Sequence, residues 1–142
     1  MRRRHGAAVL LDTHAWIWLV NGDERLSPPA RNAIADAATK ADVYVSAISA
    51  WEVGMLEAKG RIRLGRDALA WVTEAVSRPG ITLVPLTPEI AVGSSRLPGY
   101  PHGDPADRIL IATARVLPAT LITHDARILE YGESDHISVL PT

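Results

Sequence analysis

The sequence has no cysteine and no phenylalanine, and it has only two lysines among its 142 residues. The absence of cysteine excludes a disulfide framework and a thiolate metal site, and it is typical of proteins that work in a reducing compartment. The sequence also lacks a long hydrophobic run, because nothing in it approaches the ~18 consecutive apolar residues of a membrane-spanning helix. The apolar stretch behind the basic segment Met1–Gly6 breaks at Asp12, which is too short for a secretory signal. We therefore expect a cytoplasmic protein that makes no membrane contact.

Hydrophobic residues make up 47% of the chain, which is enough for a sizeable core. The length fits a single domain over residues 1–142, and no repeat or long linker divides the sequence. The net charge of −1 neither indicates nor excludes a nucleic-acid partner.

Short apolar runs alternate with helical patterns along the chain. The runs predict five strands, at residues 7–11, 43–45, 81–84, 120–123 and 137–140. The segments between them predict helices at residues 13–19, 27–39, 47–59, 66–77, 104–117 and 125–131, with a surface loop over residues 93–103. Strands separated by helices connect by right-handed crossovers, so we expect an α/β fold with a mostly parallel sheet covered on both faces. Ligands of such sheets bind at the carboxyl ends of the strands.

Four acidic residues lie at these strand-to-helix junctions. Asp12 is the first polar residue after the first strand, and Asp125 lies just past the fourth. Glu52 comes early in the helix that follows the second strand. Asp107 lies one turn into the helix that Asp104 opens. Because the carboxyl ends of parallel strands share one edge of the sheet, these four side chains are expected to converge there.

Each acid also has a purely structural explanation. Asp12 and Asp125 could cap the helices that follow them, and Asp104 is placed to be an N-cap with proline behind it. Residues 49–52 match a capping box, in which Glu52 reaches back to Ser49. Taken alone, Glu52 and Asp104 are better explained as cap residues.

Taken together, the four acids need a further explanation. Carboxylates at one edge repel one another unless a cation or shared protons relieve the repulsion. Hard oxygen donors, without cysteine and without histidine at ligand spacing, suit Mg²⁺ or Mn²⁺ better than zinc. Such an ion can activate a water and orient it toward a phosphodiester, so the acids predict a metal-dependent phosphodiesterase site.

Four segments resemble, in order, the motifs of the VapC group of PIN-domain toxins. These segments are Leu10–Trp18, Ser46–Val53, His102–Ala114 and Leu121–Asp125, and together they extend over nearly the whole chain. The resemblance implies a three-layer α/β/α sandwich with a five-stranded sheet. It also implies a Mg²⁺- or Mn²⁺-dependent endoribonuclease that cleaves RNA, is inhibited by a cognate antitoxin and assembles as a homodimer.

The resemblance also implies roles for individual residues. Four acids take the family's catalytic and metal-binding positions: Asp12, Glu52, Asp107 and Asp125. Asp104 matches a position common in this group but outside the set of metal ligands, and Thr123 matches a hydroxyl position beside the site.

Several other residues have two interpretations. Arg108 either contacts phosphate or pairs with a neighbouring acid. The arginines of one basic turn either contact RNA or are simply solvated: Arg61, Arg63 and Arg66. The histidines that flank the motifs are better explained as hydrogen-bonding or surface residues than as catalysts: His14, His102 and His124. A tryptophan exposed on the surface would indicate a partner surface.

Three alternative functions compete with the toxin ribonuclease. A receiver-like signalling module also places acids at strand ends, but it needs a lysine at the end of a late strand, and Lys40 and Lys59 end no strand. A catalytically weak binding subunit with the PIN fold is disfavoured because all four acids are present. A non-toxin nuclease that processes RNA would carry the same site.

Overall fold

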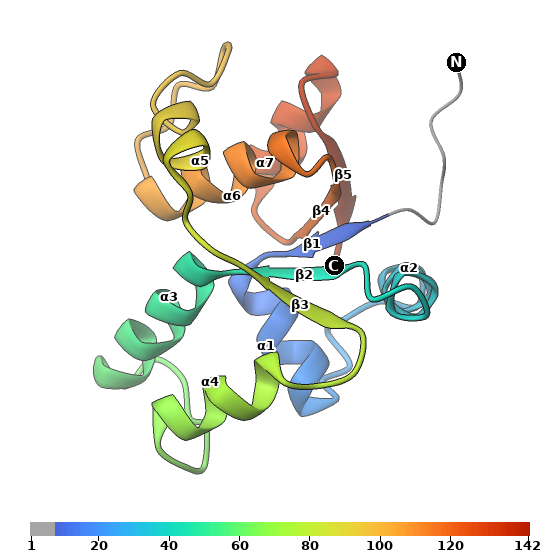
Figure 1. Cartoon of the computed structure of the whole chain (residues 1–142), viewed down its shortest axis with the longest axis vertical. Helices are drawn as coiled ribbons and strands as arrows, with labels where there is room; N and C mark the ends of the chain where they lie inside the picture. Colours follow the sequence, from blue (N-terminus) through green and yellow to red (C-terminus); the bar gives the residue numbers. More distant parts are fainter. Residues whose placement is uncertain (1–7) are drawn as a thin grey trace.

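The computed structural model describes residues 8–142, which form one five-stranded sheet (Figure 1). The strands are β1 (Val9–Leu11), β2 (Val43–Ser46), β3 (Ile81–Val84), β4 (Thr120–Thr123) and β5 (Ser138–Pro141). All neighbouring strands pair in parallel, in the order β3-β2-β1-β4-β5. The prediction of a mostly parallel sheet is therefore confirmed.

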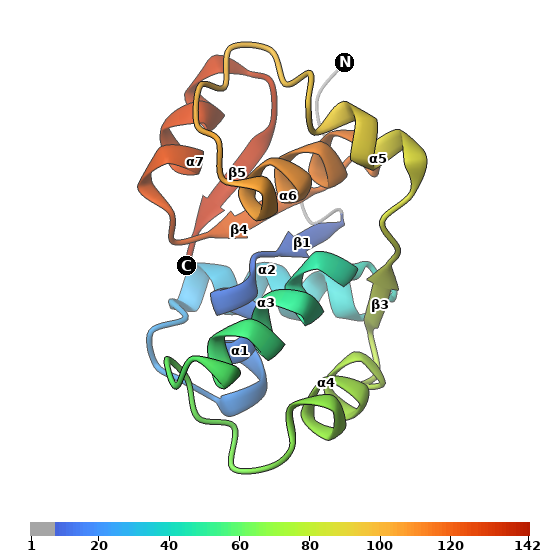
Figure 2. The ribbon, with the colours of Figure 1, turned by 90° about the vertical axis from the view of Figure 1, so that its left-hand side faces the viewer.

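Helices cover both faces of this sheet. They are α1 (Thr13–Asn21), α2 (Pro28–Ala38), α3 (Ala47–Ala58), α4 (Ala68–Val76), α5 (Pro88–Gly93), α6 (Pro105–Val116) and α7 (Ala126–Tyr131), followed by the 3₁₀ turn η1 (Gly132–Ser134). Figure 2 shows α5, α6 and α7 on one side of the strands and α1, α3 and α4 on the other. This is the expected three-layer α/β/α sandwich. None of the helices found in residues 8–142 is long and apolar enough to cross a membrane.

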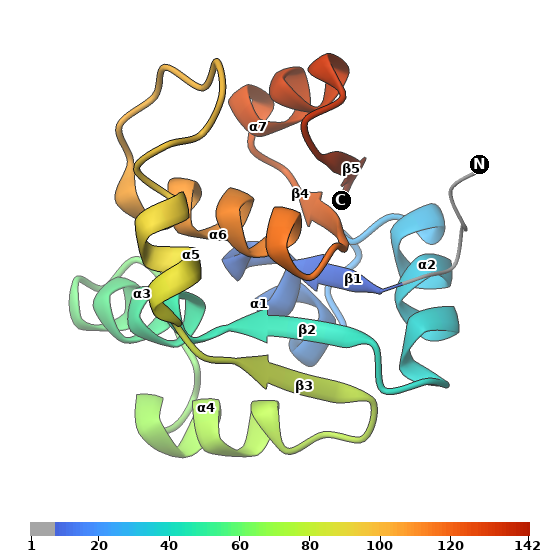
Figure 3. The same ribbon diagram turned by 45° about the horizontal axis from the view of Figure 1, so that its top comes forward.

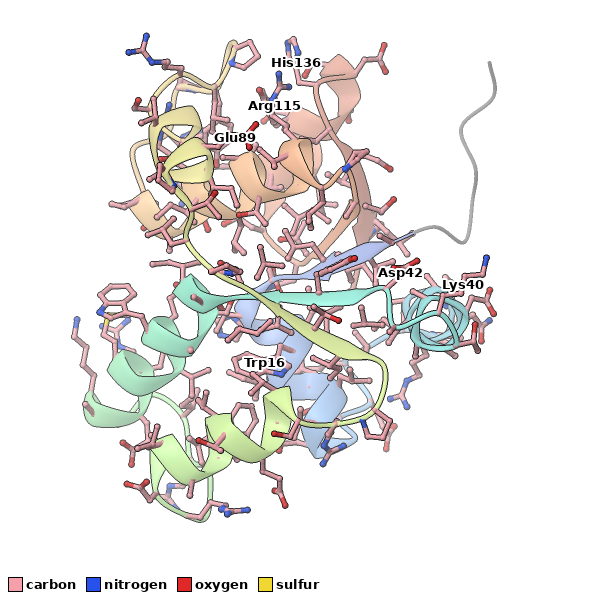
Figure 4. The ribbon with its side chains drawn as sticks, viewed as in Figure 1. Trp16, Lys40, Asp42, Glu89, Arg115 and His136 are labelled. Carbon is pink, nitrogen blue, oxygen red and sulfur yellow. The ribbon has the colours of Figure 1, made fainter. Side chains whose placement is uncertain are left out.

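The two faces of the sheet are packed by separate sets of side chains. Leu11 on β1 packs with α1, α2 and α4, around the buried Trp16 (Figure 4). Leu10, one residue earlier, packs on the opposite face with α6 and α7. Successive side chains of a strand point to opposite faces, so a doubly covered strand requires a continuous apolar run.

The order of the strands fixes where a ligand can bind. The chain runs outward from β1 to β2 and β3, and then returns to the other side of β1 to form β4 and β5. The direction of winding therefore reverses between β1 and β4. In open parallel sheets the binding crevice lies at this switch point, beyond the carboxyl ends of the two strands. Figure 3 shows β2 and β3 pointing toward the side of the molecule where α3 and the start of α6 lie.

Two local expectations from the sequence are corrected. Residues 88–93 form the short helix α5, which was not predicted; Thr87 caps it and Pro88 stands at its first position, so a start signal was present. The first strand is shorter than expected, beginning at Val9, and Ala7 lies outside the described residues. The remaining strands and helices agree with the expected ranges to within two residues at most ends.

The expected capping box at the start of α3 is wrong. The N-cap of α3 is Ser46, whose hydroxyl accepts a hydrogen bond from the Ile48 amide at 3.0 Å. Ser49 lies one turn inside the helix and is fully buried. Because Ser49 is not the N-cap, Glu52 cannot form a capping box with it. The capping role preferred for Glu52 from the sequence therefore does not hold.

The first prediction tests this assignment. Ser46→Ala removes the acceptor for the Ile48 amide, so we expect the free energy of unfolding to fall by ~1 kcal/mol. Chemical denaturation of the variant and the wild type measures the difference. An unchanged unfolding midpoint would show that the Ser46 hydroxyl does not stabilise the helix start.

Candidate active site

Asp12 forms the centre of the site. Its side chain is 6% exposed and stands at the carboxyl end of β1. One carboxylate oxygen accepts from the Ala15 amide at 2.8 Å, which caps α1, and the other accepts from the Thr123 hydroxyl at 2.7 Å and the His124 amide at 3.2 Å. Asp12 is therefore the N-cap of α1, as expected, and it also lies at the edge of the sheet where the acids were expected.

Thr123 and Asp125 come to the site from the end of β4. The Thr123 hydroxyl donates to Asp12 and accepts from the Asp125 amide at 3.0 Å. One Asp125 carboxylate oxygen caps α7 by accepting from the amides of Arg127 and Ile128. Thr123 lies beside the acidic residues, as the sequence predicted, and it holds two of them in register.

Glu52 reaches the same region from α3. Its carboxylate accepts a hydrogen bond from the hydroxyl of Thr13, the residue after Asp12, and Ser49 Oγ lies 3.0 Å from that hydroxyl. Burial raises the pKa of Glu52, the Thr13 hydrogen bond opposes this, and the charges of Asp104 and Asp12 raise the pKa further. Thr13, 3% exposed, was not identified from the sequence. Its position next to Asp12 was the available signal.

Asp107 lies on the first turn of α6 and is the most perturbed acid of the site. Burial, a contact with the Asp104 carboxyl group, and the charges of Asp125 and Glu52 together raise the pKa of Asp107 to about 8. Asp104 itself is the N-cap of α6 and accepts from the Asp107 amide, as predicted. The mutual effects on pKa show that acids from three separate junctions share one electrostatic environment.

Two histidines border Asp12. His124 Nδ1 lies 3.5 Å from the Asp12 carboxylate, and this contact raises the pKa of His124 although partial burial opposes it. The rings of His14 and His124 meet edge-on at 4.7 Å, and burial together with the neighbouring His124 lowers the pKa of His14. His124 therefore contacts an acid of the site directly, and His14 contacts His124.

The Arg108 side chain pairs with backbone carbonyls rather than with a neighbouring acid. Its guanidinium donates to three backbone carbonyls, those of Ser94, Tyr100 and His102, at 2.7 to 3.1 Å. The side chain therefore fastens the loop over residues 94–104 to the start of α6. No sequence pattern indicates that an arginine will donate to backbone carbonyls in this way.

The arginines of the basic turn are exposed, whereas Trp18 lies near this centre, with its ring 5.3 Å from that of His124. Arg66 forms an exposed ion pair of 2.8 Å with Glu74, while Arg61 and Arg63 are exposed. Three of the four tryptophans are buried, and Trp51 on α3 is 58% exposed. An exposed side chain of this size is the partner-surface signal anticipated from the sequence.

The acids fit a hard divalent cation in chemistry but are not yet arranged as a ligand set. All four side chains offer oxygen, the donor that Mg²⁺ and Mn²⁺ prefer, and a cation would relieve the repulsion that raises the pKa of Asp107. Across residues 8–142, no three histidine or acidic side chains have the spacing to hold a metal ion as they stand.

Comparison with known proteins gives consistent matches over most of the chain. The PIN domain family model matches residues 9–134. Ribonuclease VapC22 of Mycobacterium tuberculosis is 34% identical over 131 residues, which cover 92% of this chain and 97% of that protein.

Solved structures show the same fold at low sequence identity. VapBC2 from Rickettsia felis, bound to a DNA fragment from its promoter, has a TM-score of 0.67 at 14% identity and covers 94% of this chain and 98% of its own. DNA-bound VapBC from Salmonella typhimurium has a TM-score of 0.66 at 16% identity, with 95% and 98% covered.

The second prediction concerns Asp107 and pH. The pKa of this group rises from 3.8 to about 8 in the folded protein, so between these values the folded state binds more protons than the unfolded state. The free energy of unfolding should therefore fall as the pH rises through this window, in the presence of a chelator. Asp107→Asn should flatten that dependence and stabilise the protein at the alkaline end, as measured by thermal melts.

Asp36→Asn on the exposed face of α2 is the matched control, and it should keep the slope of the wild type. Equal slopes in all three proteins would mean that Asp107 keeps an ordinary pKa in the folded state.

Proposed function

This chain belongs to the PIN domain family, and from that premise we propose that it is a divalent-metal-dependent endoribonuclease, the toxin of a toxin–antitoxin pair. The observation that supports this most directly is that four acids from the strand-to-helix junctions affect one another's pKa near the switch point of the sheet, where Thr123 is hydrogen-bonded to Asp12. A relative named as a ribonuclease matches nearly the whole chain, and proteins of the same fold occur in VapBC complexes. A receiver-like module has no support from these matches.

In this proposal, Asp12, Glu52, Asp107 and Asp125 would hold one or more Mg²⁺ or Mn²⁺ ions. When bound, the metal supplies a water of lowered pKa and neutralises charge on the oxygen that leaves the phosphodiester. The residues of the chain position the ligands: Thr123 holds the Asp12 carboxylate, and Thr13 holds that of Glu52.

The protonation state of Asp107 should affect metal binding. Asp107 holds a proton near neutral pH without metal, because its neighbours are acidic and it is partly buried. Metal binding would displace that proton, so metal affinity should increase with pH.

The proposed partners are an RNA substrate, a cognate antitoxin and a second copy of the chain. The antitoxin is supported by the VapBC complexes that share the fold, and the homodimer rests on the family resemblance alone. We take residues 1–142 as a single catalytic domain, since both hydrophobic clusters pack against one sheet. We place its action in the cytoplasm, where cellular RNA substrates occur.

The third prediction tests the metal and Glu52 together. The purified protein should cleave single-stranded RNA with Mg²⁺ or Mn²⁺ and stop when EDTA is added. Glu52→Gln retains the acceptor for Thr13 but loses the charge, so cleavage should fall by ~100-fold or more while the melting temperature stays unchanged or rises. Initial rates on a labelled RNA and a thermal melt measure both effects.

Glu57→Gln, an exposed change on the same helix, is the matched control and should cleave like the wild type. Cleavage that survives chelation and is lost in Asp12→Asn would contradict the metal mechanism. Cleavage that survives both changes would come from a contaminating nuclease.

The fourth prediction concerns toxicity. Induction of the chain alone should arrest bacterial growth, and co-expression of its antitoxin should restore growth. Asp107→Asn should relieve the arrest at equal protein level, whereas Asp36→Asn should not. Arrest by the Asp107 variant as strong as that by the wild type would show that toxicity has another source. Harmless expression of the wild type would favour the catalytically weak binding subunit.

A further inference from the structure

A pocket of about 320 Å³ lies between the loop over residues 94–104 and the segment that comes after Asp125. Tyr100 and His102 line it from the loop, Arg127 and Tyr131 from α7, and His136 from the turn before β5. In Figure 4, His136 lies at the top of the molecule, between the loop and the end of α7. The volume is at the lower end of the range for small-ligand pockets, roughly 300–1,000 Å³.

Four aromatic rings form a continuous row in this wall. His102 packs edge-on against Tyr100 at 5.1 Å, Tyr100 against Tyr131 at 5.0 Å, and Tyr131 stacks on His136 at 5.5 Å. The two tyrosines are buried in the middle of the row, while His136 is exposed at one end. The row is therefore rigid in the middle and leaves ring surface at its end for a flat ligand.

Tyr100 is only 5% exposed, and its hydroxyl is buried without a hydrogen-bond partner within the described residues. Burial and the charges of Asp107 and Asp125 raise the pKa of Tyr100 to about 12, so the hydroxyl keeps its proton. A buried hydroxyl without a partner is costly, so its retention calls for an explanation. The nearby Tyr131 hydroxyl, in contrast, donates to the Pro98 carbonyl at 2.7 Å.

Arg127 connects the pocket to the acids. Its backbone amide donates to Asp125 at 2.8 Å, its side chain is on the pocket wall, and it lowers the pKa of Tyr100 by its charge. Glu130, one turn further along α7, lines the same pocket. Arg127 supplies a positive charge on this wall, which suits a phosphate.

We propose that this pocket binds a nucleobase of single-stranded RNA, next to the phosphodiester that the acids cleave. The proposal rests on the proposed ribonuclease function and names how that site selects its substrate. Aromatic faces for stacking, a cation for the adjoining phosphate and an unused hydroxyl for the base or ribose are the groups that recognise unpaired RNA. The base stacks on His136 at the open end of the row, and Arg127 contacts the phosphate.

A first experiment uses ligands that cannot be cleaved. Adenosine 5′-monophosphate is titrated into the full chain, and the ring resonances of His102 and His136 are followed by NMR. Ribose 5-phosphate, which has the same phosphate but no base, is the matched ligand. We expect the mononucleotide to shift both histidines, and ribose 5-phosphate, which lacks the base and keeps only the phosphate contact, to shift them much less. Equal shifts by the two ligands would reveal a simple anion site and overturn the proposal.

Two variants locate the base. His136→Ala should weaken binding of the mononucleotide ~5-fold or more, the loss expected for one stacking contact. Arg127→Ala should weaken it as well, whereas Arg78→Ala, an exposed arginine before the amino end of β3, should not. Wild-type affinity in both pocket variants would contradict the proposal.

A second experiment examines the hydroxyl of Tyr100 during catalysis. Tyr100→Phe keeps the ring, so it should raise KM for RNA ~2- to 10-fold with little change in kcat, and it should not lower the melting temperature. An unchanged KM would show that the hydroxyl makes no contact with substrate.

The pocket and the proposed function can fail separately. A wild type that binds the mononucleotide at His136 but cleaves no RNA would refute the ribonuclease and leave the pocket standing. A wild type that cleaves RNA, with KM unchanged in His136→Ala and no mononucleotide shifts, would refute the pocket alone.

Discussion

The hydrogen bond from Thr123 to Asp12 is the contact on which the site depends, because it joins two strand ends that are 111 residues apart in sequence. It forms only if β4 lies beside β1, and that pairing exists only if the chain reverses its winding direction after β3. The strand order therefore positions Asp12 and the end of β4 relative to each other through this hydrogen bond. Asp12 caps α1 with one oxygen and holds β4 with the other, so its position is fixed before any ligand arrives.

The same convergence creates a conflict between stability and function. Asp107 and Glu52 are raised in pKa because partial burial and like charges oppose their ionisation. A protein selected only for stability would lose such acids, since replacing them removes both the repulsion and the cost of partly burying a charge. Their presence together at the switch point is therefore best explained by a ligand that takes up the negative charge. The bound form would then be more stable than the free form.

Periodicity and chain order made most of the fold predictable from the sequence, whereas the features that depend on side-chain contacts were missed. Apolar runs indicated all five strands, and parallel pairing brought the acids to one edge. The capping box at Ser49 was wrong because β2 extends one residue further, which makes Ser46 the last strand residue and the cap at once. Thr13 and Tyr100 carry no motif of their own, and their roles appear only when distant segments meet.

Arg108 shows how the two parts of the site are kept in register. It comes directly after Asp107 on α6, so one turn of helix presents an acid to the acidic edge of the sheet and a guanidinium to the loop. Three carbonyls of that loop, those of Ser94, Tyr100 and His102, accept from this guanidinium. An irregular segment of this length would otherwise be the most mobile part of the fold. Through Arg108, α6 therefore holds in place both Asp107 and the loop that carries Tyr100.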